Sequence, residues 1–266
     1  MRTELIWLEI AKKDLEAARC LFCKKLYPHS VFYLQQSIEK AAKSLVIRDK
    51  IITTEEDLKK RIGHAGWQVA FILKEKLIED LKKYPMLIEK LRQVKGPINI
   101  NKLLREYQRY EKKLTKKAGE KKLWKISSSR KYLNDMLTEI SRVTKINKLN
   151  KLLKNMSLQE TLKTLKKELR NQIIRSCHIE TEENKKKLNE QIEQIELFPL
   201  RTFCYLSLIS LSFVFSPHAI RSRYPEDNFN PLNVYDEKMP LIQMLDSFIK
   251  ITEESLENLE QYVARS

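Results

Sequence analysis

The scarcity of glycine is the feature that most limits what this chain can fold into: it has four in 266 residues. Strand-rich folds and cofactor loops need glycine at turns, because glycine adopts positive φ at no steric cost. The four are Gly63, Gly66, Gly96 and Gly119. Their spacing matches neither G-x-G-x-x-G nor G-x-x-x-x-G-K-[ST], so the usual dinucleotide and P-loop sites are excluded. With 42% hydrophobic residues to form a core, we expect an all-α fold.

Eight prolines divide the chain into long intervals, in which apolar residues recur every three or four positions. This period is typical of amphipathic helices. A proline marks a helix boundary because it lacks an amide donor, and Ser30 and Thr54 are expected to cap helix starts. The pattern predicts helices over about residues 1–26, 30–48, 54–84 (with a break at Gly63), 101–118, 129–147, 157–176, 181–197, 200–215 and 241–262.

Positive charge is concentrated in the middle of the chain. The net charge is +16, and residues 86–197 hold 28 basic against 14 acidic residues, a net of +14. Between Lys102 and Lys131, twelve basic residues face only three acidic ones, with Tyr107, Tyr110 and Trp124 interleaved. Like charges at this density repel unless a polyanion neutralises them. We expect nucleic acid here and no membrane, because a membrane helix also needs a broad apolar face, and Leu103, Leu104 and Leu114 are too few to form one.

Cysteine usage and the amino terminus indicate a reducing cytoplasm. Cys20-x-x-Cys23 has no second CxxC, so a zinc or redox role is the lesser alternative to two buried thiols. Arg2, Glu4 and Glu9 interrupt any signal-peptide apolar run. The most apolar stretch, residues 203–215, is too short to cross a bilayer. No metal or cofactor is predicted.

Four segments resemble the HEPN domain family. They are the helix with Asp14-Leu15-Glu16-Ala17-Ala18, the following run from Val31 to Lys43, Gly63-His64, and the loop of His218 with Arg221-Ser222-Arg223-Tyr224-Pro225. The resemblance covers residues 1–85 and 198–266 and implies a HEPN-like up-down helical bundle. The basic segment 86–197 has no counterpart in the minimal domain and is interpreted as an inserted basic helical subdomain.

The resemblance also implies a range of roles, from metal-independent RNases of toxin systems to non-catalytic RNA or nucleotide binding, frequently as homodimers. The RNases carry Arg, four to six residues, then His. None of the four histidines here has that spacing, which argues against cleavage. The nearest pair is Arg170 and His178, which have seven residues between them and lie within the insert. If the protein were nonetheless an enzyme, the candidate residues are His64, His178, His218, Arg170, Arg221 and Arg223.

We therefore expect a non-catalytic protein that binds RNA, structured or ribosomal. Arginine forks and a stacking tyrosine suit phosphate and base contacts. The residues expected to contact RNA are Arg221, Arg223, Tyr224, Lys112, Lys113, Lys116, Lys117, Lys121, Lys122, Trp124, Arg130 and Lys131. Against this, Arg223 could simply pair with Glu226 or Asp227. The alternatives are a divergent RNase toxin and the partner of a minimal nucleotidyltransferase. Apolar surplus on the second and last helices predicts a homodimer.

Overall fold

The computed structural model describes residues 2–62, 66–83, 119–144, 182–226 and 228–265, together with four single residues between them. The helices are α1 (Thr3–Cys23), α2 (Tyr27–Arg48), α3 (Glu55–Ile62), α4 (Gly66–Lys83), α7 (Gly119–Ser127), α8 (Arg130–Thr144), α11 (Glu182–Phe215), α12 (Pro231–Val234), α13 (Pro240–Gln243) and α14 (Leu245–Ala264). A short 3-10 helix, η1, spans Ser216–His218. The predicted helices 101–118 and 157–176 lie outside the described residues.

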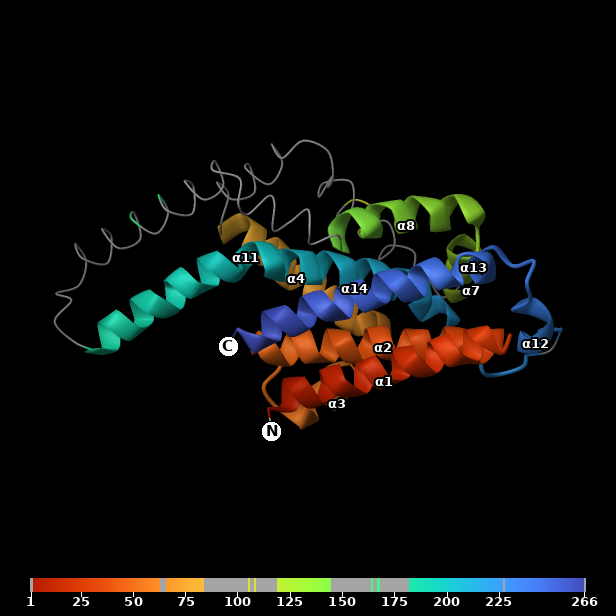
Figure 1. Cartoon of the computed structure of the whole chain (residues 1–266), viewed down its shortest axis with the longest axis horizontal. Helices are drawn as coiled ribbons and strands as arrows, with labels where there is room; N and C mark the ends of the chain where they lie inside the picture. Colours follow the sequence, from red (N-terminus) through yellow and green to blue (C-terminus); the bar gives the residue numbers. More distant parts are fainter. Residues whose placement is uncertain are drawn as a thin grey trace.

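The long helices form a bundle with roughly parallel axes (Figure 1). α1 and α2 pack along each other as an antiparallel hairpin, and α14 lies against both. α11 contacts α2, α4, α8 and α14, so it is the central helix. Both chain termini lie at one end of the bundle, and α12 lies at the other (Figure 1). The prediction of an all-α helical bundle is confirmed, since the described part contains no strand beyond one isolated bridge.

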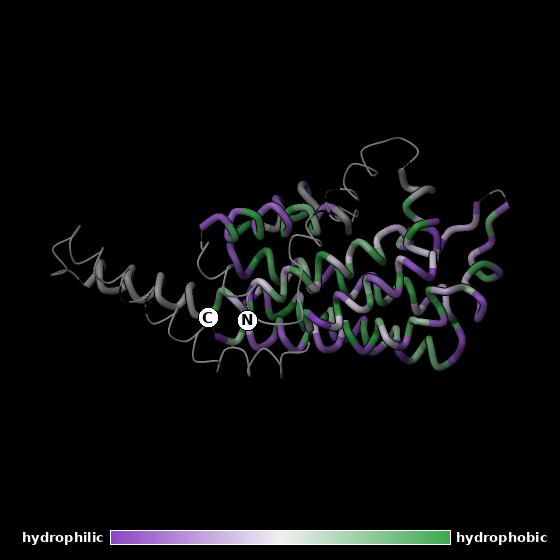
Figure 2. The backbone as a smooth tube through the Cα atoms, turned by 90° about the horizontal axis from the view of Figure 1, so that it is seen from above, coloured by the Kyte–Doolittle hydropathy of each residue, from purple (hydrophilic) through white to green (hydrophobic). Residues whose placement is uncertain are grey.

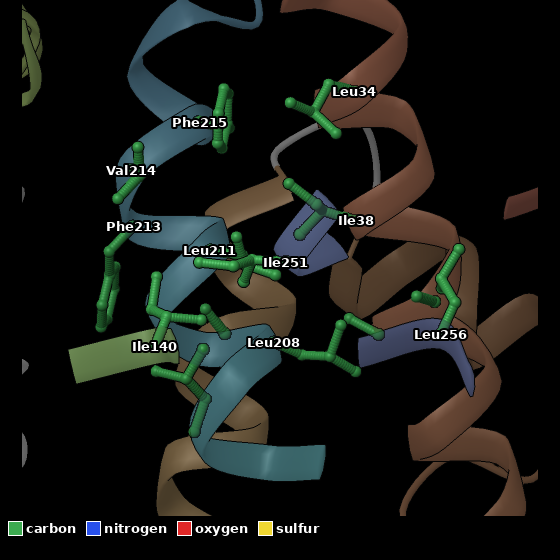
Figure 3. Close-up of a cluster of buried hydrophobic side chains, with 14 of the residues drawn as sticks. Leu34, Ile38, Ile140, Leu208, Leu211, Phe213, Val214, Phe215, Ile251 and Leu256 are labelled. Carbon is green, nitrogen blue, oxygen red and sulfur yellow. The ribbon is translucent and has the colours of Figure 1, made fainter. Parts of the chain in front are cut away.

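The core is built around the second half of α11. Every residue from Leu197 to Phe215 is buried, and the side chains of α2, α8 and α14 converge on this stretch (Figure 3). The hydrophobic sides of the surrounding helices face inward (Figure 2). Each large apolar side chain removed from water in this way contributes about 1.5–3 kcal/mol. Burial of this half of α11 on all sides explains why residues 203–215 carry no charge and lack a polar outer face.

The boundary predicted at Pro199 is wrong, because α11 continues through it from Glu182 to Phe215. A proline inside a helix costs about 3 kcal/mol, through a missing hydrogen bond and a clash with the preceding turn. Burial of the neighbouring Phe198 and Leu200 offsets that cost. The apolar stretch is consequently longer than predicted. Leu197–His218 has the length and composition to span a membrane, but its apolar residues up to Phe215 are all buried within the protein.

Two helices from the predicted insert belong to the same core as the bundle. α7 was not predicted as a helix, and α8 matches the helix predicted over 129–147. Leu123 of α7 is fully buried, as are Leu133 and Ile140 of α8, and α8 packs on both α11 and α14. The buried residues of α7 and α8 thus share one hydrophobic core with the bundle. The domain division at residues 85 and 198 stays a prediction.

Helix starts and helix faces differ partly from the expected ones. Thr54 caps α3 as predicted, its Oγ1 accepting the Asp57 amide at 3.1 Å. Ser30 is not a cap: α2 begins earlier, at Tyr27, and the Ser30 hydroxyl instead donates to the Ala18 carbonyl at 2.7 Å. The broad apolar faces of α2 and α14 are buried within the chain, since both helices touch several others. They therefore do not supply the surplus surface from which a homodimer was predicted.

Candidate functional site

The loop between α11 and α14 is shaped by its own backbone hydrogen bonds. The amides of Ser222 and Tyr224 donate to the carbonyls of His218 and Ile220, at 2.9 and 3.1 Å. Glu226 and Phe229 exchange two backbone bonds, of 3.0 and 2.9 Å, around a turn in which Asn228 has φ 64°. Asn tolerates this left-handed conformation better than most residues. Asn230 then caps α12 by accepting the Leu232 amide at 3.0 Å. The loop is therefore ordered by turns.

His218 lies behind this loop in a closed chain of hydrogen bonds. Its Nε2 is 3.0 Å from Ser127 Oγ and its Nδ1 is 2.9 Å from the Tyr235 hydroxyl. Ser127 donates to the Trp124 carbonyl at 3.0 Å, and Trp124 Nε1 donates to the Tyr235 hydroxyl at 3.3 Å. Each donor is used once if Nε2 carries the imidazole proton and Nδ1 accepts. The network thus assigns a neutral histidine with the proton on Nε2.

Complete burial lowers the pKa of His218 to about 3. A protonated, positively charged imidazole would have no water to solvate it here, and the positive charge of the nearby Arg221 lowers the pKa by a smaller amount. An accessible imidazole that titrates near neutrality is what general acid or base catalysis needs. His218, named above as a candidate catalytic residue, has neither property. It joins α7 to η1 instead.

Arg221 is held between two aromatic rings. Its guanidinium carbon lies 5.0 Å from the centre of the Trp124 ring and 4.9 Å from that of Phe229. It also pairs with Glu226, Nη2 to Oε2, at 3.3 Å. The Arg221 side chain is only 13% exposed. Its faces and its charge are thus engaged within the protein, so it fixes the loop to α7 and does not lie open for RNA.

Arg223 is arranged differently, although it stands only two residues further on. Its Nε donates to the Ala219 carbonyl at 3.1 Å, and its guanidinium carbon lies 4.6 Å from the Phe32 ring centre and 4.9 Å from that of Tyr224. Of the two acids expected to neutralise it, Glu226 pairs with Arg221, and Asp227 lies outside the described residues. Among the described residues Arg223 forms no ion pair. Tyr224 is 54% exposed. A cation with aromatic neighbours and an exposed ring therefore lie side by side.

A pocket of about 780 Å³ opens between this loop and the start of α2. Its polar lining includes His29, Ser222, Arg223, Asn228 and Asn233. Its apolar lining consists of Pro28, Phe32, Pro225, Phe229, Pro231, Leu232 and Val234. A volume in this range accommodates a small organic molecule. His29 is exposed, and its place in the pocket was not anticipated from the sequence.

The remaining predicted residues are spread over several parts of the chain. His64, Arg170, His178 and the lysines Lys112, Lys113, Lys116 and Lys117 lie outside the described residues. Lys121 and Lys122 belong to α7, whose Trp124 is half-buried. Arg130 begins α8 and is hydrogen-bonded to Gln243, and Lys131 beside it is exposed. The structure thus places Trp124 against Arg221 and Tyr224 against Arg223, whereas Arg130 lies at Gln243 of α13.

Two of the cysteines are placed differently from the prediction. Cys20 and Cys23 are both exposed free thiols rather than buried ones, because they lie on the outer side of α1. Cys204 is buried, which raises the pKa of its thiol, and Cys177 lies outside the described residues. In the described part of the chain, no three His, Cys, Asp or Glu side chains gather as they would around a metal ion.

A second polar cluster lies at the opposite end of α2. Asp49 accepts hydrogen bonds from the hydroxyls of Tyr205 and Tyr262, the latter at 2.6 Å. Burial, and next the charge of Asp49, raise the pKa of both tyrosines. Nearby, Arg201 forms an ion pair of 3.0 Å with Asp80, and their side chains are only 8% and 5% exposed. The groups of this cluster bind one another.

These features define an all-α bundle with an open, mixed polar and apolar pocket at one end, and a comparison with known families identifies the family of the chain. The family model described as HEPN domain matches residues 5–137, which is half of the chain. The chain therefore belongs to the HEPN domain family. No curated protein and no solved structure matches it.

The extent of the match differs from the expected one. The resemblance was placed on residues 1–85 and 198–266, whereas the family model runs through α7 and into α8 and ends before the Arg221–Pro225 loop. Part of the segment interpreted as an insert thus falls within the family match. One wall of the pocket, which contains His29 and Phe32, also lies within it. The other wall, with Ser222 and Arg223, lies outside it.

Proposed function

We propose that this HEPN protein binds single-stranded RNA without cleaving it, in the cytoplasm. The observation that carries the proposal is the pair of Arg223 and Tyr224 beside the pocket. The arginine has no described ion-pair partner, and the tyrosine ring is 54% exposed. Stacking on an exposed ring and a guanidinium fork on phosphate are the two contacts by which proteins hold single strands.

The charge of the chain supports a polyanionic partner. The net charge is +16, of which +14 falls within residues 86–197. Such an excess attracts nucleic acid at long range, whatever its sequence. An exposed aromatic ring favours a single strand over a duplex, because the bases of a duplex are already stacked on one another.

Cleavage is less well supported than binding. A metal-independent RNase needs a histidine that can take up and release a proton at the substrate. His218 is neutral and enclosed, so it does not meet this requirement. The neighbouring Arg221 is occupied by Glu226 and two rings. These placements favour the non-catalytic alternative.

The test is a comparison of two variants in RNA binding. Replacing both Arg223 and Tyr224 by alanine removes a phosphate contact and a stacking platform, so affinity for a labelled single-stranded RNA should fall by about 1–3 kcal/mol, roughly 5- to 150-fold. Arg19→Ala is the matched control, because Arg19 is an exposed arginine paired with Glu253 on another surface. Fluorescence anisotropy measures both. Equal affinities for the double variant and the control would contradict the proposal.

A second measurement concerns the lysines. Replacing Lys112, Lys113, Lys116, Lys117, Lys121 and Lys122 by glutamine should flatten the slope of log affinity against log salt. On a single strand the slope changes by about 0.7 for each phosphate that is no longer neutralised, hence by at most about four units. A variant that keeps the wild-type slope would show that the lysines do not contact RNA. Incubating wild-type protein with the same RNA in EDTA checks that the strand stays intact.

Two partner proposals are tested separately. Light scattering at micromolar concentration measures whether the chain forms a homodimer. A minimal nucleotidyltransferase as partner would be shown by co-purification of the two chains from a common operon. Neither partner accounts for the +16 charge, and RNA does, so RNA is the partner we favour.

A further inference from the structure

We propose that Cys20 and Cys23 form a reversible disulfide, which loosens the turn between α1 and α2 when the two thiols are oxidised. The oxidant is a low-molecular-weight disulfide such as oxidised glutathione. This inference goes beyond the proposed function, because it concerns a covalent change in α1 and not the binding of RNA. Three features support it, which are the exposure of both thiols, their spacing on the last turn of α1, and the structure of the cap that follows.

Both thiols are free and exposed, in contrast to that of Cys204, which is buried in the core. Cys20 lines a groove between α1 and α14, and Cys23 is the last residue of α1. A redox role was the lesser alternative as long as the two thiols were expected to be buried. Because both are in contact with solvent, a small disulfide can reach either of them.

The helix holds the two cysteines close to the separation that a disulfide spans. The Cα atoms of residues three apart in an α-helix are about 5 Å from each other, as the rise and radius of the helix require. Disulfides join Cα atoms that are roughly 4.4–6.8 Å apart. The Cβ atoms are the tighter constraint, since a separation of about 5–6 Å in the helix must shrink to roughly 3.5–4.5 Å. Closing the bond therefore requires the last turn of α1 to deform.

The cap at the end of α1 is linked to one of the two cysteines. Lys25 has φ 59°, and the amide of Leu26 donates to the carbonyl of Leu21 at 2.9 Å. This is the pattern of a Schellman cap, in which glycine usually occupies the left-handed position because a side chain is sterically unfavourable there. The amide of Lys24 donates to the carbonyl of Cys20 at 3.2 Å. A deformation at Cys20 therefore acts directly on the hydrogen bonds of the cap.

The end of α2 has the same kind of cap, but it is anchored in the bundle. Lys50 has φ 54°, and the amide of Ile51 donates to the carbonyl of Val46 at 2.9 Å. The preceding residue, Asp49, accepts hydrogen bonds from two buried tyrosines. This cap contains no cysteine. The molecule thus provides an internal reference for the cap of α1.

The turn after α1 is held at the protein surface and not from within the core. Lys24, Lys25 and Leu26 are all exposed. Lys25 pairs with Glu237 at 2.8 Å, and the Tyr27 hydroxyl donates to the same carboxylate at 3.1 Å. An ion pair between two exposed side chains adds little stability. This turn can therefore yield to a new covalent bond more easily than the anchored end of α2.

The reaction is a thiol–disulfide exchange in two steps. The thiolate of one cysteine attacks the disulfide of the oxidant, so that a mixed disulfide forms and one small thiolate leaves. The thiolate of the other cysteine then attacks the protein sulfur of the mixed disulfide, expels the second small thiolate and closes the bond between Cys20 and Cys23. The two protein thiols are oxidised, the oxidant is reduced to two thiols, and the departing thiolates take up the two protons that the protein loses. An excess of reduced glutathione reverses both steps.

Peptide mapping of the full-length protein tests the disulfide. Trypsin cuts after Arg19 and Lys24, so one peptide contains both Cys20 and Cys23 and no other cysteine. The folded protein is incubated with oxidised glutathione, and the remaining thiols are alkylated before digestion. The peptide should then be unlabelled and lighter by two hydrogen atoms, whereas after reduction it should carry two labels. A peptide that carries glutathione or alkyl labels after oxidation, or that is joined to a second copy of the chain, would overturn the proposal.

Single-cysteine variants are the matched controls. In Cys20→Ser and in Cys23→Ser the second step is impossible, so oxidised glutathione should leave a glutathione adduct on the remaining thiol. Wild-type protein treated in the same way should show the internal disulfide in place of the adduct. Equal yields of adduct in wild type and variants, or no adduct in either variant, would show that the two thiols do not react as a pair. Thermal unfolding confirms that each variant is folded.

Amide hydrogen exchange tests the loosening of the turn, with no RNA present. On oxidation the amides of Lys24, Lys25 and Leu26 should exchange roughly twofold to tenfold faster, which is the effect of losing one hydrogen bond. The amides of Lys50 and Ile51, in the cap without cysteines, should exchange at unchanged rates. A disulfide that forms while exchange at the end of α1 stays unchanged would overturn the loosening of the turn.

Discussion

The two ends of α2 differ in how their polar groups find hydrogen-bond and ion-pair partners. At its carboxyl end the chain reverses through Asp49 and Lys50, and Asp49 accepts hydrogen bonds from Tyr205 and Tyr262. The nearby Arg201 and Asp80 neutralise each other. At its amino end, the His29 amide lacks a helical partner, and within the described part of the chain the Ser222 hydroxyl has no hydrogen-bond partner and Arg223 has no ion pair.

The difference separates stability from function within one bundle. Buried polar groups generally need partners, and the Asp49 carboxylate and the two tyrosine hydroxyls find them in the protein itself, whereas Arg48 Nε has no hydrogen-bond partner among the described residues. Groups whose partners are missing are retained at a cost in stability, which is reasonable where a ligand supplies the partners. Substitutions at the first end should therefore change the free energy of unfolding, and substitutions at the second should change binding.

The largest effect is expected at the buried ion pair. Arg201→Ala removes the closer of the two cations paired with the buried carboxylate of Asp80 and leaves Lys76, whose Nζ lies 3.4 Å from Oδ1. The free energy of unfolding should therefore fall by at most about 3–5 kcal/mol. Urea denaturation measures this. Arg19→Ala, which breaks the exposed pair with Glu253, should cost less than about 1 kcal/mol. If the two variants lost similar free energies of unfolding, the buried pair of Arg201 and Asp80 would be no more important for stability than an exposed pair.

An intermediate effect is expected from His218 on acidification. Its pKa is about 3 in the folded chain and about 6.5 when unfolded, so between these values the unfolded state binds more protons. The neutral form contributes fully above pH 6.5, and stability declines as pH falls. At pH 5.5 the loss attributable to His218 should be about 1.4 kcal/mol.

His218→Gln is the control for this titration, because glutamine can hydrogen-bond but does not titrate in this range. The difference between the wild-type and variant stabilities, measured by urea denaturation from pH 7.5 to 4.5, isolates the contribution of this histidine from that of the carboxylates. A pH-independent difference would mean that His218 is not held neutral. Such a result would place an accessible titrating histidine at the pocket end.

The smallest effect on stability is expected for Ser222→Ala. The hydroxyl has no partner to lose, so the free energy of unfolding should change by less than about 0.5 kcal/mol or should rise slightly. Thermal and urea unfolding measure this change. A loss of about 1 kcal/mol or more would show that the hydroxyl is satisfied within the protein, and the pocket end would then resemble the Asp49 end.

The sequence was sufficient for the fold class and for most helices. Glycine scarcity and the three-to-four periodicity are local signals, and they predicted the all-α bundle and the helices now seen as α1, α2, α8 and α14. Thr54 was identified as a cap because its signal lies within one turn. The start of α2 was missed, since Pro28 at a first helical turn and Ser30 as a cap are both acceptable locally.

The site could be predicted only in part. Arg223 and Tyr224 were singled out by residue type and resemblance, but Arg221 was expected to play the same role. Its packing on Trp124 joins residues about one hundred positions apart, which no local pattern shows. His29 was missed for the same reason, because only the folded bundle brings the start of α2 to the loop. His218 was expected at an open site, and its burial depends on α7, which was not predicted.

The two walls of the pocket differ in whether they fall within the family match. The wall with His29 and Phe32 lies within the stretch that matches the HEPN domain, and the wall with Ser222 and Arg223 lies beyond it. A related chain that kept residues like 5–137 and ended differently would inherit one wall without the other. Membership of the family therefore does not imply that a protein has this pocket. A search for proteins with the same pocket should require segments like residues 28–32 and 222–234 in one chain.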